Sequence, residues 1–377
     1  MNKLKIVVDE NIASSECFEF LGEVIKLNGR EISNQNLREC DILIVRSVTK
    51  VDQQLLKNTK VRFVGTATSG IEHVDLNYLF ENKIHFADAI GCNAFAVAEY
   101  VITAITKLLA DWNDNFTNHT IGIIGFGNIG TKVARMCEAL GIKVLLNDPP
   151  VQRINNSFIS VPLNEILKCD IITLHVPLTF EGEDKTFNLL DENLHLLKEN
   201  SILINTSRGG VVNETKLLQI LRDKKVRLVT DVWMNEPNVN DDLLIKSVIS
   251  TPHIAGYSIE GKINGTKMIF DKLNKFLGTD FSFDFFSNQN ENEILEFHNK
   301  LTPANLHQLL KRIYDIEKDS IAMKKMFNQQ SEEKNSYFDD LRKNYPHRKS
   351  FNNYLIRTSN ESAKSILEKL RFNVELI

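Results

Sequence analysis

Short apolar runs alternate with helix-like segments along most of the chain. The runs are rich in Val, Ile and Leu and occur at residues 4–8, 41–45, 61–68, 121–125, 143–148, 170–176, 201–207, 227–233 and 248–251. Strands that alternate with helices are typical of parallel sheets whose strands are joined by helical crossovers. The pattern therefore predicts an α/β protein with two doubly wound parallel sheets.

A long apolar segment at residues 94–110 separates the two series of runs. Its apolar side chains recur at helical spacing, which predicts a buried helix. Residues 281–293 form a break that is first aromatic and then rich in Asn and Glu. Beyond it, residues 301–319 predict one helix with Pro303 in its first turn. A further helix and an apolar strand at 372–377 are expected to end the chain.

Composition narrows the class of protein. The chain has 377 residues, 42% of them hydrophobic and 25% charged, which is enough for two or three domains with their own cores. The net charge of -4 gives no sign of a nucleic-acid partner, and we find neither a signal peptide nor an apolar run long enough to cross a membrane. The five cysteines are scattered and form no CxxC pair, so we expect neither a disulfide framework nor a metal site. These features predict a cytoplasmic protein with reduced thiols.

Residues 125–130 read GFGNIG, a complete GxGxxG motif that follows one predicted strand and opens a predicted helix. Asp148 stands at the end of the next predicted strand. In that setting the glycines let backbone amides approach a pyrophosphate, and the carboxylate accepts hydrogen bonds from the adenosine ribose hydroxyls. Asp148 would repel the 2′-phosphate of NADP, so the motif favours NAD. The alternative is a glycine turn that binds no ligand.

Three polar residues follow predicted strands of the second sheet, namely Arg208, Glu236 and His253. Ligands bind at the carboxyl ends of strands in such sheets, so the three side chains can face one crevice. Oxidation of a 2-hydroxy acid needs a base for the hydroxyl proton, which suits His253, and a carboxylate on the other ring nitrogen, which suits Glu236. The Arg208 guanidinium can hold the substrate carboxylate in two parallel hydrogen bonds. Taken singly, Arg208 could instead be a solvated loop residue, Glu236 a turn residue and His253 a satisfied polar group near the core.

Four motifs carry a resemblance to a known family, namely GFGNIG, INTSRGGVVNE, DVWMNEP and TPHIAGYSIEG. With these motifs the chain resembles the D-isomer-specific 2-hydroxyacid dehydrogenases. The resemblance implies a Rossmann NAD domain at residues 94–256, inserted in a flavodoxin-like substrate domain at residues 1–93 and 257–285. It also implies a C-terminal α+β dimerisation domain at residues 286–377.

The resemblance implies roles for individual residues as well. It assigns catalysis to Arg208, Glu236 and His253, with His253 as the proton donor in the reductive direction. The residues that it places at NAD are Gly125, Gly127, Asn128, Ile129, Gly130, Asp148, Val176, Thr206, Ser207, Arg208, Asp231 and Gly256. At Val176 many members of the family have Thr, so a hydroxyl is lost there, while a backbone contact to NAD can remain.

At the substrate the resemblance places Ser47, Thr68 and Tyr257, and the neighbouring Arg46 offers a cation that suits a phosphate. Further motifs, among them VRSVTKV and FDDLRKNY, extend the resemblance over nearly the whole chain, to members that oxidise a phosphorylated hydroxy acid. The expected partners are therefore such a small molecule and a second copy of the chain, with neither nucleic acid nor membrane. Two alternatives stay open: a dehydrogenase for another phosphorylated 2-hydroxy acid, such as 3-phosphoglycerate, and a noncatalytic NAD-binding module.

A basic run in the last part of the chain has two interpretations. Its members are Arg342, Lys343, His347, Arg348 and Lys349. A solvated charged face is the favoured interpretation. The other is that the run borders the substrate site and attracts the phosphate.

Overall fold

The computed structural model describes residues 3–286 and 293–377. Part of the break that we expected at residues 281–293 therefore lies outside the described residues. Within the described ranges, no helix is long and apolar enough to cross a membrane. In the same ranges, no group of three or more His, Cys, Asp and Glu residues is placed to hold a metal ion.

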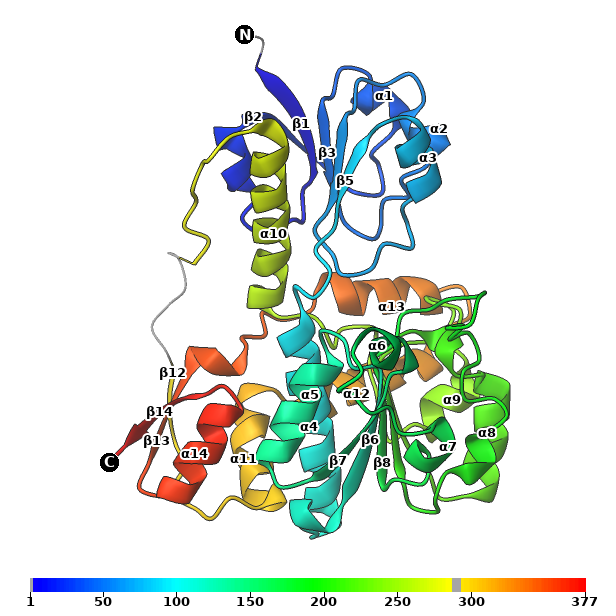
Figure 1. Ribbon diagram of the computed structural model, residues 1–377, viewed down its shortest axis with the longest axis vertical. Coiled ribbons are helices and arrows are strands. Elements are labelled where there is room, and N and C mark those ends of the chain that lie inside the picture. Colours follow the sequence, from blue (N-terminus) through cyan, green and yellow to red (C-terminus); the bar gives the residue numbers. More distant parts are fainter. Residues whose placement is uncertain (1–2, 287–292) are drawn as a thin grey trace. The chain divides into compact units, whose positions relative to one another are not determined.

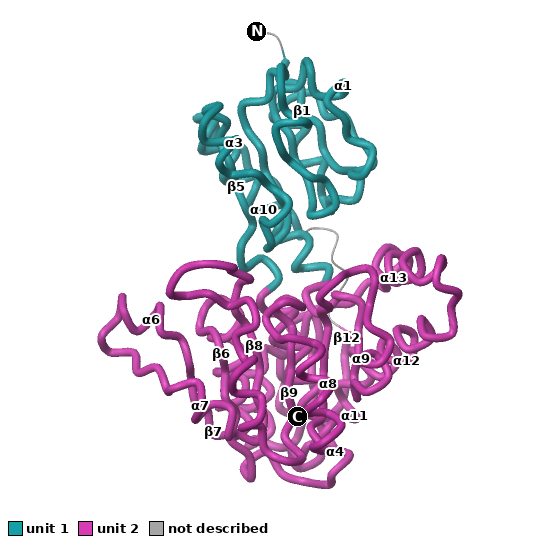
Figure 2. Tube along the Cα trace, turned by 90° about the vertical axis from the view of Figure 1, so that its right-hand side faces the viewer, with its two compact units in different colours: residues 1–93, 258–291 teal, residues 94–257, 292–377 magenta. Residues whose placement is uncertain are grey.

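The chain divides into two compact units (Figure 2). Unit 1 contains residues 1–93 and 258–291, and unit 2 contains residues 94–257 and 292–377. The chain therefore passes from unit 1 to unit 2 and back again before its last segment joins unit 2.

Unit 1 is built on a five-stranded parallel sheet (Figure 1). Its strands are β1 (Leu4–Asp9), β2 (Gly22–Leu27), β3 (Ile42–Val45), β4 (Phe63–Thr66) and β5 (His85–Ala87). They lie in the order β2-β1-β3-β4-β5, which is that of flavodoxin-like doubly wound sheets. The helices of the unit are α1 (Asn34–Leu37), α2 (Gln53–Leu56), α3 (Leu76–Glu81) and α10 (Ile259–Leu277).

Alternating side chains of these strands fill two cores, one on each face of the sheet. On β1, Ile6 and Val8 belong to a core with Phe270 of α10, whereas Val7 belongs to the opposite core with Leu79 of α3. Both faces are thus covered by helices, as a parallel sheet requires.

Unit 2 contains a six-stranded parallel sheet. Its strands are β6 (Thr120–Ile124), β7 (Lys143–Asn147), β8 (Ile171–Leu174), β9 (Ile202–Asn205), β10 (Arg227–Thr230) and β11 (Ile249–Ser250). Their order is β11-β10-β9-β8-β6-β7, so the winding reverses between β6 and β8. Doubly wound sheets bind their ligands at the carboxyl ends of strands at such a reversal. The helices that follow these strands are α5 (Gly130–Ala139), α6 (Pro149–Ile154), α7 (Leu163–Ile166), α8 (Glu214–Asp223) and α9 (Asp241–Lys246).

The long helix α4 (Ala94–Asp111) lies at the centre of unit 2. Nearly all of its side chains are buried, as the apolar segment predicted. It packs against α5 and against α11 (Pro303–Ile313), which belongs to the last segment of the chain. These helices share one core with Ile121, Ile171 and Ile204 of the sheet. The last segment therefore completes the core beneath the six-stranded sheet.

The last segment also forms a small sheet of its own. Besides α11 it contains α12 (Ile316–Lys324), α13 (Lys334–Lys343), α14 (Glu361–Lys369), β12 (Glu293–Glu296), β13 (Tyr354–Thr358) and β14 (Asn373–Leu376). We expected an α+β arrangement, but the three strands run parallel in the order β12-β13-β14. The reason is that α14 crosses between β13 and β14, which returns the chain in the same direction.

Some elements differ from the sequence-based prediction. The single helix predicted at 301–319 is two helices, because Tyr314 leaves the helical conformation and the Asp315 side chain caps α12. The segment Lys334–Lys343, for which no element was predicted, is a helix that buries Phe338. The strands β2 and β5 were not predicted: β2 carries charged residues between its apolar ones, and β5 is only three residues long.

Replacement of Leu310 by Ala tests whether α4 and α11 share a core. Leu310 is fully buried, so we expect the cavity to lower the free energy of unfolding of unit 2 by about 2–5 kcal/mol. Both tryptophans, Trp112 and Trp233, lie in unit 2, so urea unfolding followed by tryptophan fluorescence measures the change. Ile159→Ala, at a side chain of unit 2 that is 79% exposed, is the matched control. Unchanged amide hydrogen exchange in β6 of the Leu310 variant would contradict a shared core.

Candidate active site

The loop at the carboxyl end of β6 carries the GxGxxG motif. Gly125 has a φ of 92°, in the left-handed region that favours glycine. A Cβ at Gly130 would lie 1.9 Å from the Gly125 carbonyl oxygen, so only glycine lets α5 begin this close to β6. A Cβ at Gly127 would meet no protein atom within 4 Å, which leaves this backbone open to close approach by a ligand. Ile129 gives the first amides of α5 no side-chain cap, so the loop fits a pyrophosphate.

Asp148, directly after β7, is tied to the glycine loop. One carboxylate oxygen accepts a hydrogen bond from the Phe126 N–H at 2.7 Å, and the other accepts from the Val151 N–H at 2.9 Å. Each oxygen has a second lone pair, so the carboxylate can also accept hydrogen bonds from ribose hydroxyls. In the same loop, the Asn128 carbonyl accepts a hydrogen bond from Lys132 Nζ at 2.8 Å. Asp148 thus joins the glycine loop to the cap of α6.

The residues that follow β8 contact the glycine loop from the neighbouring strand. A Cβ at Gly125 would lie 2.5 Å from the His175 carbonyl oxygen and 3.0 Å from Cγ1 of Val176. The His175 ring lies between the hydroxyls of Thr173, at 3.0 Å, and Thr206, at 3.4 Å. Burial lowers the pKa of His175 to about 3, so its ring is neutral at physiological pH. Val176 offers only its backbone for a polar contact with NAD.

The turn after β9 holds Arg208 in place. Oδ1 of Asn205 accepts hydrogen bonds from the Ser207 N–H at 3.1 Å and from the Ser207 hydroxyl at 2.7 Å. Nδ2 of Asn205 donates to the Arg208 carbonyl at 3.1 Å, and Nη1 of Arg208 donates to the Ser207 carbonyl at 2.8 Å. Thr206 and Ser207 are buried, whereas Arg208 is partly exposed. We had not singled out Asn205; the signal was a polar residue at the end of an otherwise apolar strand.

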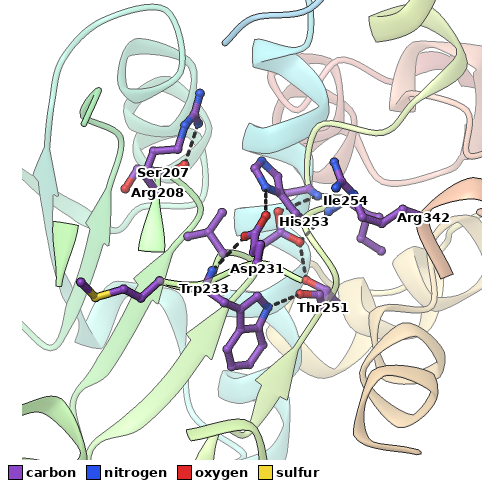
Figure 3. Close-up of polar contacts among 12 residues, drawn as sticks. Ser207, Arg208, Asp231, Trp233, Thr251, His253, Ile254 and Arg342 are labelled. Carbon is purple, nitrogen blue, oxygen red and sulfur yellow. Dashed lines mark hydrogen bonds and ion pairs between the residues drawn. The ribbon is translucent and has the colours of Figure 1, made fainter. Parts of the chain in front are cut away.

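A buried carboxylate, Asp231, organises the loop that follows β11. Oδ1 accepts hydrogen bonds from the Thr251 hydroxyl at 2.6 Å and from the Ile254 N–H at 2.8 Å, and Oδ2 accepts from the Ala255 N–H at 2.9 Å (Figure 3). The Asp231 carbonyl accepts from the His253 N–H at 2.7 Å. These contacts satisfy a side chain that water hardly reaches. Asp231 therefore binds the loop that carries His253, while its contact with NAD stays a prediction.

His253 and Glu236 form a hydrogen-bonded pair. Nδ1 of His253 lies 2.8 Å from Oε2 of Glu236, and Oε1 of Glu236 accepts from the Trp233 N–H at 2.9 Å. His253 has a φ of 57°, which costs a non-glycine residue about 1–2 kcal/mol and is common at functional sites. Because Nδ1 faces the carboxylate, Nε2 is the ring nitrogen that can exchange a proton with a substrate.

The two carboxyl groups near this pair differ in their electrostatics. Burial alone would raise the pKa of Glu236, but His253, the Trp233 N–H and Arg342 outweigh burial and hold the pKa below its ordinary value. Glu236 is therefore ionised at neutral pH. By contrast, burial raises the pKa of Glu214, which accepts a hydrogen bond from the Met234 N–H at 2.7 Å. Glu214 belongs to the INTSRGGVVNE motif, but no role was predicted for it.

Arg342 joins this group from the last segment of the chain. Its Nη2 donates to the Tyr257 hydroxyl at 3.1 Å. Tyr257, which we predicted at the substrate, follows Gly256 in the loop that begins at His253. Figure 3 shows Arg342 on one side of His253 and Arg208 on the other.

The basic run is only partly a solvated face. Lys343 and His347 are exposed, and Lys349 is partly exposed. Arg348 is buried and donates to the Ala255 carbonyl. The favoured interpretation of the sequence therefore fails for Arg348 and for Arg342, because both guanidinium groups are used inside unit 2.

The other predicted substrate residues lie in unit 1. Arg46 and Ser47 follow β3 and Thr68 follows β4, at the carboxyl ends of neighbouring parallel strands. Nε of Arg46 donates to the buried Asp9 carboxylate at 3.0 Å. The Thr68 hydroxyl lies 2.9 Å from that of Thr66, and Ser47 is exposed. Unit 1 thus holds one group of candidate residues and unit 2 holds the other.

Two parts of the chain match known families. Residues 107–255 match the family described as D-isomer specific 2-hydroxyacid dehydrogenase, NAD binding domain. Residues 286–370 match a domain of unknown function, DUF3410. The chain is 42% identical over 378 residues to an erythronate-4-phosphate dehydrogenase of Escherichia coli O157:H7, and the match covers 98% of each chain. It is 40% identical over 379 residues to one of Wigglesworthia glossinidia brevipalpis, again over 98% of each.

Solved structures resemble the fold. NAD+-bound 3-phosphoglycerate dehydrogenase of Entamoeba histolytica has a TM-score of 0.61 and 25% identity, covering 73% of this chain and 96% of that one. An acyclic imino acid reductase in complex with NADPH and D-Arg has a TM-score of 0.63 and 23% identity, covering 73% and 97%, which shows the fold alone. The relatives that match along nearly the full length show the family as well as the fold. By that likeness the chain belongs to the erythronate-4-phosphate dehydrogenase family, and its central part to the NAD-binding domains of the D-isomer specific 2-hydroxyacid dehydrogenases.

Proposed function

We propose that the chain oxidises 4-phospho-D-erythronate to (R)-3-hydroxy-2-oxo-4-phosphobutanoate with NAD, a step in the biosynthesis of pyridoxal 5′-phosphate. The observation that carries the proposal is the 2.8 Å contact between His253 and Glu236, in the same unit as a glycine loop that fits a dinucleotide. The name of the full-length relatives, erythronate-4-phosphate dehydrogenase, supplies the substrate. A noncatalytic NAD-binding module would have no use for a buried carboxylate that orients an imidazole.

His253 acts on the hydroxyl proton of the substrate. Its Nε2 accepts this proton as C2 loses a hydride, and returns it in the reductive direction. The ionised Glu236 fixes the tautomer of the ring and stabilises the imidazolium that forms. NAD, when bound, supplies the acceptor for the hydride.

Arg208 binds the substrate carboxylate. Its planar guanidinium can donate two parallel hydrogen bonds to a carboxylate, and it also stabilises the developing carbonyl oxygen. The hydrogen bonds of Asn205 within the turn support this role, because they restrict the backbone from which the side chain projects. Asn205 is thus a positioning residue for Arg208.

Asp148 accounts for the preference for NAD. Its carboxylate accepts hydrogen bonds from ribose hydroxyls and repels a 2′-phosphate. Its bond with the Phe126 N–H supports this role, because it places the carboxylate beside the glycine loop. Titration of the chain with both dinucleotides tests the preference, and equal affinity for NAD and NADP would contradict it.

The chain also forms a homodimer through its last segment and works in the cytoplasm. Large apolar side chains of this segment are 43–61% exposed, and a second copy would cover them: Ile294, Ile321, Phe327, Leu376 and Ile377. The five cysteines are free, which fits a reducing compartment. Light scattering measures the oligomeric state, and the mass of a single chain would contradict the dimer.

Replacement of His253 by Ala should reduce turnover of 4-phospho-D-erythronate by roughly two to four orders of magnitude, because the proton loses its acceptor. The absorbance of NADH measures turnover, and a separate titration should show nearly unchanged affinity for NADH. His195→Ala, at an exposed histidine of unit 2, is the matched control and should keep full activity. Near-normal turnover in the His253 variant would remove this residue from the mechanism. An unaltered chain that oxidises 3-phosphoglycerate instead would refute the substrate.

Two glycine variants separate cofactor binding from folding. Gly127→Ala should weaken NAD binding about tenfold or more but leave the melting temperature nearly unchanged, since the new Cβ meets no protein atom. Gly130→Ala should lower the free energy of unfolding by about 1–3 kcal/mol, because its Cβ would overlap the Gly125 carbonyl oxygen. Calorimetric titration with NAD and thermal unfolding measure the two effects. A Gly127 variant that binds NAD as tightly as the unaltered chain would show that the loop does not approach the pyrophosphate.

A further inference from the structure

Arg342 reaches the His253 loop from a segment far away in the sequence. It lies on α13, and its Nη2 donates to the Tyr257 hydroxyl at 3.1 Å. Its guanidinium carbon is 5.8 Å from the ring centres of both Tyr257 and Phe338, so aromatic rings restrict it. Arg342 is therefore held in one place close to the proposed reacting groups.

The charge of Arg342 is not neutralised by an ion pair. Burial alone would lower the pKa of this guanidinium, but Tyr257 and Glu236 outweigh burial, so the pKa stays above its ordinary value and the group is charged. Glu236 contributes at a distance, since its two oxygens are engaged by His253 and by the Trp233 N–H. Among the residues that the structure describes, no ion pair joins Arg342 to a carboxylate, while Asp339, three residues earlier on α13, also favours the charged guanidinium. Its positive charge is therefore available to an anionic ligand.

One donor of Arg342 also lacks an acceptor. The buried Nε–H has no hydrogen-bond partner in residues 3–286 or 293–377. Buried donors without acceptors destabilise a folded chain, so they are rare and often mark functional sites. A phosphate oxygen would satisfy this donor, because guanidinium groups form short, charge-assisted hydrogen bonds with phosphate.

Arg348 provides a contrast. It too has buried donors without partners, but it lies wholly inside the core, over the Tyr314 ring at 4.4 Å. Its Nη2 donates to the carbonyls of Ala96 and Ala255. Arg342 is only partly buried and contacts a neutral hydroxyl instead. Of these two guanidinium groups, Arg342 is the one that a small anion can reach.

The substrate of the proposed function has an anionic group on each side of its reacting carbon. We propose that Arg342 binds the phosphate end, opposite the carboxylate end bound by Arg208, and thereby selects phosphorylated hydroxy acids. This inference rests on the proposed function and adds a specificity-determining residue to it. The placement of the two arginines on either side of His253 agrees with it (Figure 3). The segment that matches a domain of unknown function then supplies part of the substrate site.

The test compares Arg342→Gln with Arg342→Lys on two substrates, 4-phospho-D-erythronate and D-erythronate, which lacks the phosphate. Arg342→Gln should raise KM for the phosphorylated acid about tenfold to a hundredfold, with little change in kcat, because an ionic hydrogen bond is lost. KM for D-erythronate should not change, and the Lys variant should recover part of the loss, since it keeps the charge without the fork. Lys343→Gln, at the exposed neighbour on the same helix, is the matched control.

The outcomes separate the two proposals. Equal losses on both substrates, with unchanged affinity for NAD, would mean that Arg342 only supports Tyr257, and would overturn the inference. An Arg342→Gln variant that behaves like Lys343→Gln would overturn it as well. If the unaltered chain oxidises neither acid, the proposed function fails, and calorimetric titration of the NAD-bound chain with inorganic phosphate still tests the anion site. Weaker phosphate binding by Arg342→Gln than by Lys343→Gln supports the inference in that case, and equal binding overturns it.

Discussion

The buried carboxylate of Asp231 is the constraint on which the active-site loop depends. It accepts hydrogen bonds from the Thr251 hydroxyl and from the N–H groups of Ile254 and Ala255. Between these contacts the backbone passes through His253 in a left-handed conformation that a residue with a side chain does not favour. Hydrogen bonds to a charged acceptor are strong enough to offset that cost. The direction of the imidazole, and hence its contact with a carboxylate partner, follows from the loop that Asp231 imposes.

Hydrogen bonds from elements that are distant in the sequence also stabilise this loop. The Tyr100 hydroxyl of α4 lies 2.7 Å from that of Thr251, and Nε1 of Trp233 donates to the Thr251 carbonyl at 3.0 Å. Arg348, from the last segment, donates to the Ala255 carbonyl. The helix α4 and the last segment share one core. The geometry of the polar site in unit 2 therefore depends on the packing of that core. This explains why the last segment lies within unit 2 and not apart from it.

Features that depend on local chemistry could be predicted from the sequence, and features that depend on distant packing could not. The glycine motif and the polar residues after successive strands are local, and the structure brings His253 and Glu236 within hydrogen-bond distance. Arg342 and Arg348 stand in a polar run that is typical of a solvated face, and nothing near them reveals the aromatic rings that they meet in the fold. The break at Tyr314 was missed for a similar reason, since its side chain is buried against α4 and fits the helical period on either side.

The packing of α11 on α4 has a consequence for how the chain is made. About half of the chain lies between these two helices, so ribosomal synthesis releases α4 long before its partner exists. Until then, the apolar face that α11 covers is exposed to water or to other chains. Contacts between such distant segments are slow to form, and uncovered apolar surface favours aggregation during the delay. In unit 1, the core on one face of the sheet likewise stays incomplete until α10 has been synthesised. A nascent chain of this family therefore needs protection of each core until the helix that completes it, α10 in unit 1 or α11 in unit 2, has emerged.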